Sequence, residues 1–289
     1  MSLGPVRYVA SITNTCSLTW TLLFVIAIGL RVAAVVTPGI WADEAFSLAM
    51  ATGHSLEHPA SAADVTLGDY VEAPSYLTAA DYRRYGEHQQ PLEGPDRVIR
   101  AVALSDTNPP GYFLLLYGWT LIFGTGNESL RSLSVVASMA CFPFLRGLAT
   151  AVGGRSAALP AVALFYASPI GLYYSSEGRM YALIWLLAVW VVWLSLRLNQ
   201  KGVGRWTAVC WILASVAGLL THYFFLPIWC VCVCWLALYR GRLTIQALTA
   251  CVALTMVAVT PWYVRAPMYL GAWHITGGWL YLDPSLSGS

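Results

Sequence analysis

The stretch Leu18–Val36, which reads LTWTLLFVIAIGLRVAAVV, decides the fold class that we expect for this chain. Apart from two threonines and Arg31 it is apolar, and as an α-helix it is long enough to cross a hydrocarbon layer of about 30 Å. The run is longer than the apolar core of a typical signal peptide, and no A-x-A cleavage pattern precedes Trp41. We therefore predict a retained first transmembrane helix, in which Arg31 either faces a polar cavity or reaches toward the lipid headgroups.

Apolar stretches of comparable length recur along the rest of the chain. The 289 residues are 58% hydrophobic and only 10% charged, whereas a soluble domain carries about 25% charged residues. The composition therefore predicts an all-α, multi-pass integral membrane protein with about seven transmembrane helices. We expect these spans at about 17–38, 131–151, 156–174, 181–197, 206–222, 224–239 and 243–262.

The apolar segment 111–124 could either cross the membrane or lie at its surface. As a helix, its fourteen residues would cover only about 21 Å. Basic residues favour the cytoplasmic side of a membrane, and they collect on one side only if this segment lies at the surface. The sequence therefore predicts a cytoplasmic N-terminus and a long extracytoplasmic loop, residues 39–130, that contains interfacial helices. The cytoplasmic connections then hold Arg146, Arg155, Arg197, Lys201, Arg205, Arg240 and Arg242.

The acidic residues are concentrated in that loop. Eleven of the 14 acidic residues lie between Asp43 and Asp106, together with only four basic residues, which gives this segment a net charge of −7. The basic residues elsewhere are scattered, so we expect no nucleic-acid partner. We expect residues 1–265 to form one transmembrane module and residues 266–289 to form an extracytoplasmic tail.

Nearly all the unusual polar residues fall on the extracytoplasmic side of this topology. Ionisable groups at membrane depth are costly, so their convergence indicates a functional site. Taken singly, each has an ordinary explanation, because exposed carboxylates are usually solvated, arginines at helix ends reach to headgroups and histidines there are usually structural. The group comprises Asp43, Glu44, Asp106, Asn108, Arg131, Tyr174, Glu177, Arg179, Tyr181 and His222.

Three short motifs occur in order along the predicted extracytoplasmic side. The pair Asp43-Glu44 follows the first apolar run, NPPGYF occupies residues 108–113, and YSSEGRMY occupies residues 174–181. Together they resemble the motifs of the GT-C superfamily, the polytopic glycosyltransferases that take sugars from polyprenyl-phosphate donors. The likeness is greatest to bacterial relatives of protein O-mannosyltransferases and aminoarabinose transferases. In this chain Asn108 stands where the family usually has His or Lys before the two prolines.

The resemblance implies a reaction and a role for each polar residue. A sugar would move from a polyprenyl-phosphate donor to a protein, lipid or glycan acceptor on the extracytoplasmic face of a membrane, by analogy a bacterial plasma membrane. Asp43 would be the general base, with Glu44 as second candidate. The donor phosphate would be bound by Arg179, Arg131 and Asn108, and the substrate pocket would be lined by Tyr174, Glu177 and Tyr181. One divalent metal ion could be held by Asp106 and His222.

Two other classes of protein fit a polytopic chain with ionisable residues. A transporter or flippase should carry polar groups near the middle of the membrane and broken helices in matched halves. Here the polar groups lie on one side and no paired halves are visible, which favours the transferase. A non-catalytic membrane scaffold is the third reading, and the convergence of several charged turns on one face argues against it.

Overall fold

The computed structural model describes residues 4–36, 39–58, 62–71, 78–106, 108–201, 204–239, 241 and 243–272. Within these ranges the chain forms eleven α-helices and no strand, so the predicted all-α class is confirmed. Four of the helices are long and apolar enough to cross a membrane, which supports an integral, multi-pass membrane protein. The predicted tail, residues 266–289, lies mostly outside the described residues.

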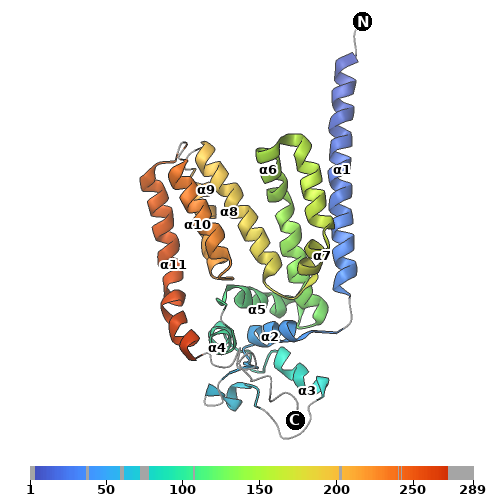
Figure 1. The fold of residues 1–289 in the computed structure, drawn as a ribbon. Helices are drawn as coiled ribbons and strands as arrows, with labels where there is room; N and C mark the ends of the chain where they lie inside the picture. Colours follow the sequence, from blue (N-terminus) through green and yellow to red (C-terminus); the bar gives the residue numbers. More distant parts are fainter. Residues whose placement is uncertain are drawn as a thin grey trace, which may run out of the picture.

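The long helices stand side by side as a bundle (Figure 1). The four of spanning length are α1 (Gly4–Val35), α6 (Asn127–Ala167), α8 (Tyr181–Lys201) and α11 (Ile245–Ala272). Two shorter apolar helices, α9 (Arg205–Leu219) and α10 (Phe225–Leu238), pack with α8 and α11. The core among these four contains Leu198, Trp211, Leu236 and Val259, which are all buried. Each predicted span overlaps a helix of this bundle, although 156–174 extends past the end of α6 at Ala167.

Helix α6 is a hairpin of two arms rather than one straight rod (Figure 1). The arms meet at Gly154, whose φ of 77° lies in the left-handed region that glycine adopts at no steric cost. The first arm corresponds to the predicted span 131–151. The predicted span 156–174 is not one helix, because the second arm ends at Ala167 and Ser168 is extended. The hydroxyl of Ser168 accepts a hydrogen bond from the N–H of Gly171 and so begins α7 (Pro169–Ser176).

The remaining helices gather at one end of the bundle, at the bottom of Figure 1. They are α2 (Ala42–Ala51), α3 (Ala79–Arg83), α4 (Pro95–Ser105) and α5 (Gly111–Phe123), with short 3-10 turns at Val65–Leu67 and Arg84–Gly86. All belong to the loop in which the sequence predicts additional helices. Helix α5 runs across the ends of the long helices instead of along them, as expected for a segment that does not cross the membrane.

The start of α5 is fixed to the connection between α9 and α10. The N–H of Gly111 donates to the carbonyl of Leu220 at 2.7 Å, and a Cβ at position 111 would lie 2.6 Å from that oxygen. Only glycine allows such a close approach of two backbones. Along its length α5 buries Phe113 and Leu116 in a second core shared with α2, α4 and α6. The loop helices are therefore packed firmly onto the bundle.

Helix α1 has an apolar outer face and a polar inner contact. Arg31 is fully buried, and its guanidinium donates to the Ser138 hydroxyl at 3.1 Å and to the carbonyls of Ala27, Tyr166 and Gly171 at 3.1, 3.3 and 3.4 Å. It therefore binds α1 to α6 and α7, and neither a cavity nor a headgroup is its partner. The exposed face carries Leu18, Leu22, Val25, Ile26, Leu30 and Val32, as a lipid-facing helix should.

Candidate active site

The first turn of α2 presents two adjacent carboxylates to different surroundings. Negative side chains are favourable at a helix N-terminus because the helix dipole is positive there. Glu44 is 1% exposed, whereas the side chain of Asp43 is 44% exposed. One carboxylate is therefore part of the interior and the other is accessible.

Glu44 is bound on both oxygens by Arg131 of α6. Arg131 Nε donates to Glu44 Oε1 at 2.8 Å and Nη2 donates to Oε2 at 2.7 Å, the paired geometry in which a guanidinium binds a carboxylate best. The N–H of Gly178 donates to Oε1 at 2.8 Å and that of Trp41 to Oε2 at 3.4 Å. Burial by itself raises the pKa of Glu44, but these hydrogen bonds lower it by more than burial raises it. The net shift is downward, so the carboxyl stays ionised.

Arg131 also caps the end of the first long helix. Its Nη1 lies 3.4 Å from the carbonyl of Val35 and its Nη2 donates to the carbonyl of Gly39 at 2.8 Å. The Glu44–Arg131 pair thus joins α1, α2, α6 and the turn after α7. This geometry gives both side chains a structural task, and their predicted contacts with substrate remain predictions.

Arg179 lies against the accessible carboxylate. Its Nη2 is 3.8 Å from Asp43 Oδ2, and its Nη1 donates to Ser47 Oγ at 3.0 Å and to the Asp43 carbonyl at 3.3 Å. The hydroxyl of Ser47 in turn donates to the Asp43 carbonyl at 2.8 Å. Arg179 Nε is buried and has no hydrogen-bond partner among the described residues. The Arg179 guanidinium therefore has an Nε–H group that no described residue accepts, and it lies beside the partly exposed carboxylate of Asp43.

Glu177 is a buried acid with one carboxylate oxygen that lacks a hydrogen-bond partner within the described part of the chain. It is 6% exposed, and this oxygen is Oε2. Burial raises its pKa to about 7, Arg179 opposes the shift, and the charges of Glu44 and Asp43 add to it. Glu177, Glu44 and Arg131 border a pocket of about 370 Å³ whose rim includes Trp41 and Tyr173. A group that exchanges a proton near neutral pH therefore lines a cavity.

The turn that carries Glu177 and Arg179 is held in one conformation. Ser134 Oγ donates to the carbonyl of Glu177 at 2.5 Å, and the N–H of Arg179 donates to the same carbonyl at 2.8 Å. A Cβ at Gly178 would lie 2.4 Å from Leu130 Cγ, so a larger residue there would displace the turn. The glycine between the two charged residues thus lets its N–H reach Glu44.

Asp106, Asn108 and His222 form a second group beside the first. Asp106 Oδ1 accepts hydrogen bonds from the backbone and side-chain nitrogens of Asn108, both at 2.9 Å. His222 Nδ1 accepts from the N–H of Phe224 at 3.0 Å. Burial lowers the pKa of His222, Asp106 opposes that shift and Arg179 adds to it, so the neutral form of the ring is favoured. Asp106 and Arg179 are both close enough to His222 for their charges to influence its pKa. The two groups of residues therefore lie in one region.

The predicted metal site has two candidate ligands. Within the described ranges, no group of three or more His, Cys, Asp or Glu side chains is placed to hold an ion. Asp106 already accepts two hydrogen bonds from Asn108, and His222 Nδ1 accepts one. A divalent ion at Asp106 and His222 stays a prediction, and the chemistry proposed below does not use it.

Tyr174 and Tyr181 connect the two groups. Their rings pack edge to face with centroids 4.8 Å apart, and the Tyr181 ring lies 6.4 Å from that of His222. All ten residues singled out from the sequence are therefore found at the same end of the bundle, the end that carries the loop helices. Their predicted roles in binding and catalysis are not tested by this proximity.

Three residues of the site were missed by sequence reasoning. The Tyr112 hydroxyl is buried and lacks a partner in the described structure; burial raises its pKa, and Arg179, Glu44 and Glu177 are close enough to influence it. Ser47 binds Arg179, and its position four residues after Asp43 on a helix was an available signal. Ser134 acts across 43 residues of sequence, and no local pattern indicates such a contact.

Comparison of the chain with protein-family models, with curated protein sequences and with solved structures found no match. The resemblance to GT-C glycosyltransferases therefore rests on the motifs themselves and remains a prediction.

Proposed function

We propose that this chain is a membrane glycosyltransferase that moves a sugar from a polyprenyl-phosphate donor to an acceptor at the face that holds Asp43 and Arg179. The observation that carries the proposal is this pair: a partly exposed carboxylate 3.8 Å from an arginine with a buried N–H that has no acceptor among the described residues. The carboxylate suits a base and the guanidinium suits a phosphate. The ordered motifs around residues 43, 108 and 177 support the same reading.

In the proposed reaction, an acceptor hydroxyl or amine attacks the anomeric carbon of the donor sugar. Asp43 takes the proton that the acceptor loses as the new bond forms. The bond between the anomeric carbon and the phosphate oxygen breaks, and polyprenyl phosphate leaves with the bonding electrons. Arg179 binds the phosphate oxygens, where negative charge increases during the reaction. Asn108 is a neutral donor in the same region.

Glu44 and Arg131 act in this proposal as positioning residues. Glu44 fixes the first turn of α2, on which Asp43 lies, and binds the N–H of Gly178, next to Arg179. The base and the phosphate-binding residue are thus held by the same buried ion pair. Such support by surrounding residues is what keeps reacting groups in a productive geometry.

The proposed topology has seven crossings: α1, the two arms of α6, α8, α9, α10 and α11. The N-terminus is cytoplasmic and the loop helices are extracytoplasmic, as the distribution of basic residues favours. The prenyl chain of the donor lies between helices, and α2 to α5 cover the site from the aqueous side. A bacterial plasma membrane is the location that the resemblance implies.

The test uses protein purified with lipid and radiolabelled polyprenyl-phosphate sugars. Wild type should transfer the sugar to an acceptor or hydrolyse the donor. Asp43→Asn should lower turnover about a hundredfold or more while donor binding persists. Arg179→Ala should weaken donor binding itself.

Asp96→Asn is the matched control, because Asp96 is an exposed acid in the first turn of another loop helix, α4. It should leave both binding and turnover unchanged. If wild type neither binds nor consumes any polyprenyl-phosphate sugar, the transferase proposal fails. Equal losses of turnover in Asp96→Asn and Asp43→Asn would show that Asp43 is not the general base.

A further inference from the structure

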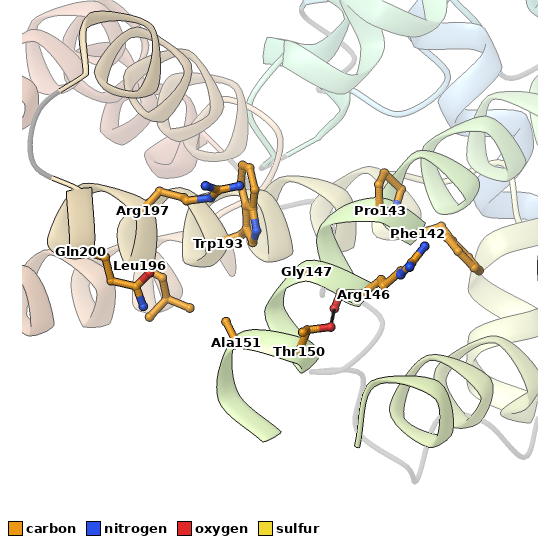
Figure 2. Close-up of a pocket in the computed structure, with 10 residues that line it drawn as sticks. All are labelled: Phe142, Pro143, Arg146, Gly147, Thr150, Ala151, Trp193, Leu196, Arg197 and Gln200. Carbon is orange, nitrogen blue, oxygen red and sulfur yellow. Dashed lines mark hydrogen bonds between the residues drawn. The ribbon is translucent and has the colours of Figure 1, made fainter. Parts of the chain in front are cut away.

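A second pocket lies at the opposite end of the bundle from the candidate active site. It has a volume of about 560 Å³ and is formed between the first arm of α6 and α8 (Figure 2). The two helices approach closely at Gly147, where a Cβ would lie 2.7 Å from Trp193 Nε1. The lining residues are Phe142, Pro143, Arg146, Gly147, Thr150, Ala151, Trp193, Leu196, Arg197 and Gln200.

The pocket carries two positive charges that no described carboxylate balances. Arg146 comes from α6 and Arg197 from α8, on its two sides (Figure 2). Arg146 lies over the ring of Trp20 at 4.4 Å and Arg197 over that of Trp193 at 4.5 Å. Glu177 is the one acidic residue of the sequence between Glu128 and Asp283, and it lies at the other end of the bundle. The pocket is therefore suited to an anion.

The polarity of the lining changes along the bundle axis. Phe142 and Trp193 line its deeper part, nearer the middle of the long helices. Thr150 and Gln200 line the part near the ends of those helices, at the α6 hairpin turn and the end of α8. An apolar floor below a basic, hydrogen-bonding rim matches an amphiphile that stands parallel to the helices. A free anion would use only the rim.

We propose that this pocket binds an anionic phospholipid of the leaflet opposite the candidate active site. The phosphate binds in the pocket, and Arg146 and Arg197 reach it by turning their guanidinium groups away from the rings of Trp20 and Trp193. The headgroup hydroxyls contact Thr150 and Gln200, and an acyl chain follows Phe142. Basic pockets between transmembrane helices commonly bind lipid headgroups in this way. The proposal requires only that the bundle is inserted in a membrane, and it does not depend on the transferase reaction.

The test is native mass spectrometry of the purified full chain in detergent, titrated with dioleoyl-phosphatidylglycerol or dioleoyl-phosphatidylcholine. Wild type should bind the anionic lipid about tenfold more tightly or better, and the double variant R146Q/R197Q should lose that preference. Arg155→Gln is the matched control, because this exposed arginine lies just beyond the hairpin turn and outside the pocket. It should keep the preference.

Ala151→Trp provides a test that leaves both charges in place. Ala151 is exposed at the pocket rim, so a tryptophan there should fold normally and exclude the lipid by filling the space. The proposal is overturned if wild type does not prefer phosphatidylglycerol, or if Ala151→Trp and R146Q/R197Q both retain the preference. Complete displacement of the lipid by millimolar inorganic phosphate would also overturn it, because the pocket would then be a site for the free anion.

Discussion

Asp43 and Glu44 are neighbours in the chain, yet the side chain of Glu44 supports the fold and that of Asp43 is partly exposed. Both carboxylate oxygens of Glu44 accept hydrogen bonds, and the donors are Arg131, Gly178 and Trp41. A buried ion pair contributes little net stability by itself, but removal of one partner leaves the other charged and unpaired in the interior. The cost of a substitution therefore depends on whether its partner is changed as well.

We predict that Arg131→Met destabilises the protein by about 3–5 kcal/mol, because Glu44 would then be a buried, uncompensated carboxylate. The measurement is the midpoint of thermal unfolding in detergent. The double variant E44L/R131M should recover much of the loss, since it removes both charges together. A double variant no more stable than Arg131→Met would show that the pair is not the source of the effect.

Glu177 makes stability depend on pH in a direction that can be worked out. Its pKa in the folded protein, about 7, is raised above the value of an unfolded glutamate. Its stabilising contribution is therefore complete below the unfolded pKa and is lost as the pH rises through 7. We predict that the free energy of unfolding falls between pH 5 and pH 8 by about 1–2 kcal/mol.

Glu177→Gln should abolish most of this dependence, because glutamine does not ionise. Exposed Glu87 offers a control, and Glu87→Gln should leave the pH profile of wild type intact. The profile is measured as unfolding midpoint against pH. An unchanged slope in Glu177→Gln would assign the titration to another group.

At the scale of elements, the sequence predicted the helices well and their contacts poorly. The apolar runs placed every helix of the bundle, because length and hydropathy are local properties. The pairing of Glu44 with Arg131 spans 87 residues and follows only from the way that α2 and α6 pack. The predicted topology placed the polar residues on one side of the membrane. Because burial depends on long-range packing, the sequence could not show that Glu44 is buried and Asp43 is partly exposed.

The contact between α5 and the α9–α10 connection can be tested with two glycines of the same helix. Gly111→Ala should destabilise the protein by about 1–3 kcal/mol, because its Cβ would lie 2.6 Å from the carbonyl oxygen of Leu220. Gly118→Ala should be neutral or stabilising by up to about 1 kcal/mol, since no atom lies within 4 Å of its Cβ and alanine favours helix. The measurement is the unfolding midpoint of each variant. Equal midpoints would contradict the close contact between Gly111 and the carbonyl of Leu220.

At the scale of the whole molecule, the two ends of the bundle differ in charge. The end with α2 to α5 carries nearly all the acidic residues, and the other carries Arg146, Arg155, Arg197 and Arg205 without a described carboxylate. This asymmetry is the physical basis of the proposed orientation, because basic residues are retained on the cytoplasmic side. The helices themselves would cross a membrane equally well in either direction.

We predict that single cysteines introduced at the two ends react with a membrane-impermeant maleimide from opposite sides. Glu87→Cys, in the loop, should be labelled on intact bacterial cells, and Arg155→Cys, beyond the hairpin turn, only after the cells are opened. The unsubstituted chain, which contains seven cysteines, gives the background labelling. Labelling of Arg155→Cys on intact cells would show that the chain has the opposite orientation in the membrane.

The contacts of Glu44 also have a consequence for the order of synthesis. When the ribosome has completed α2, this carboxylate has neither its arginine, 87 residues later, nor the N–H of Gly178, 134 residues later. Until Arg131 of α6 emerges, the nascent chain therefore holds an acid in the first turn of α2 without its ion-pair partner. A polypeptide that includes Arg131 but stops before residue 178 keeps the ion pair and lacks the Gly178 N–H, one of the donors that fix Glu44 next to Asp43.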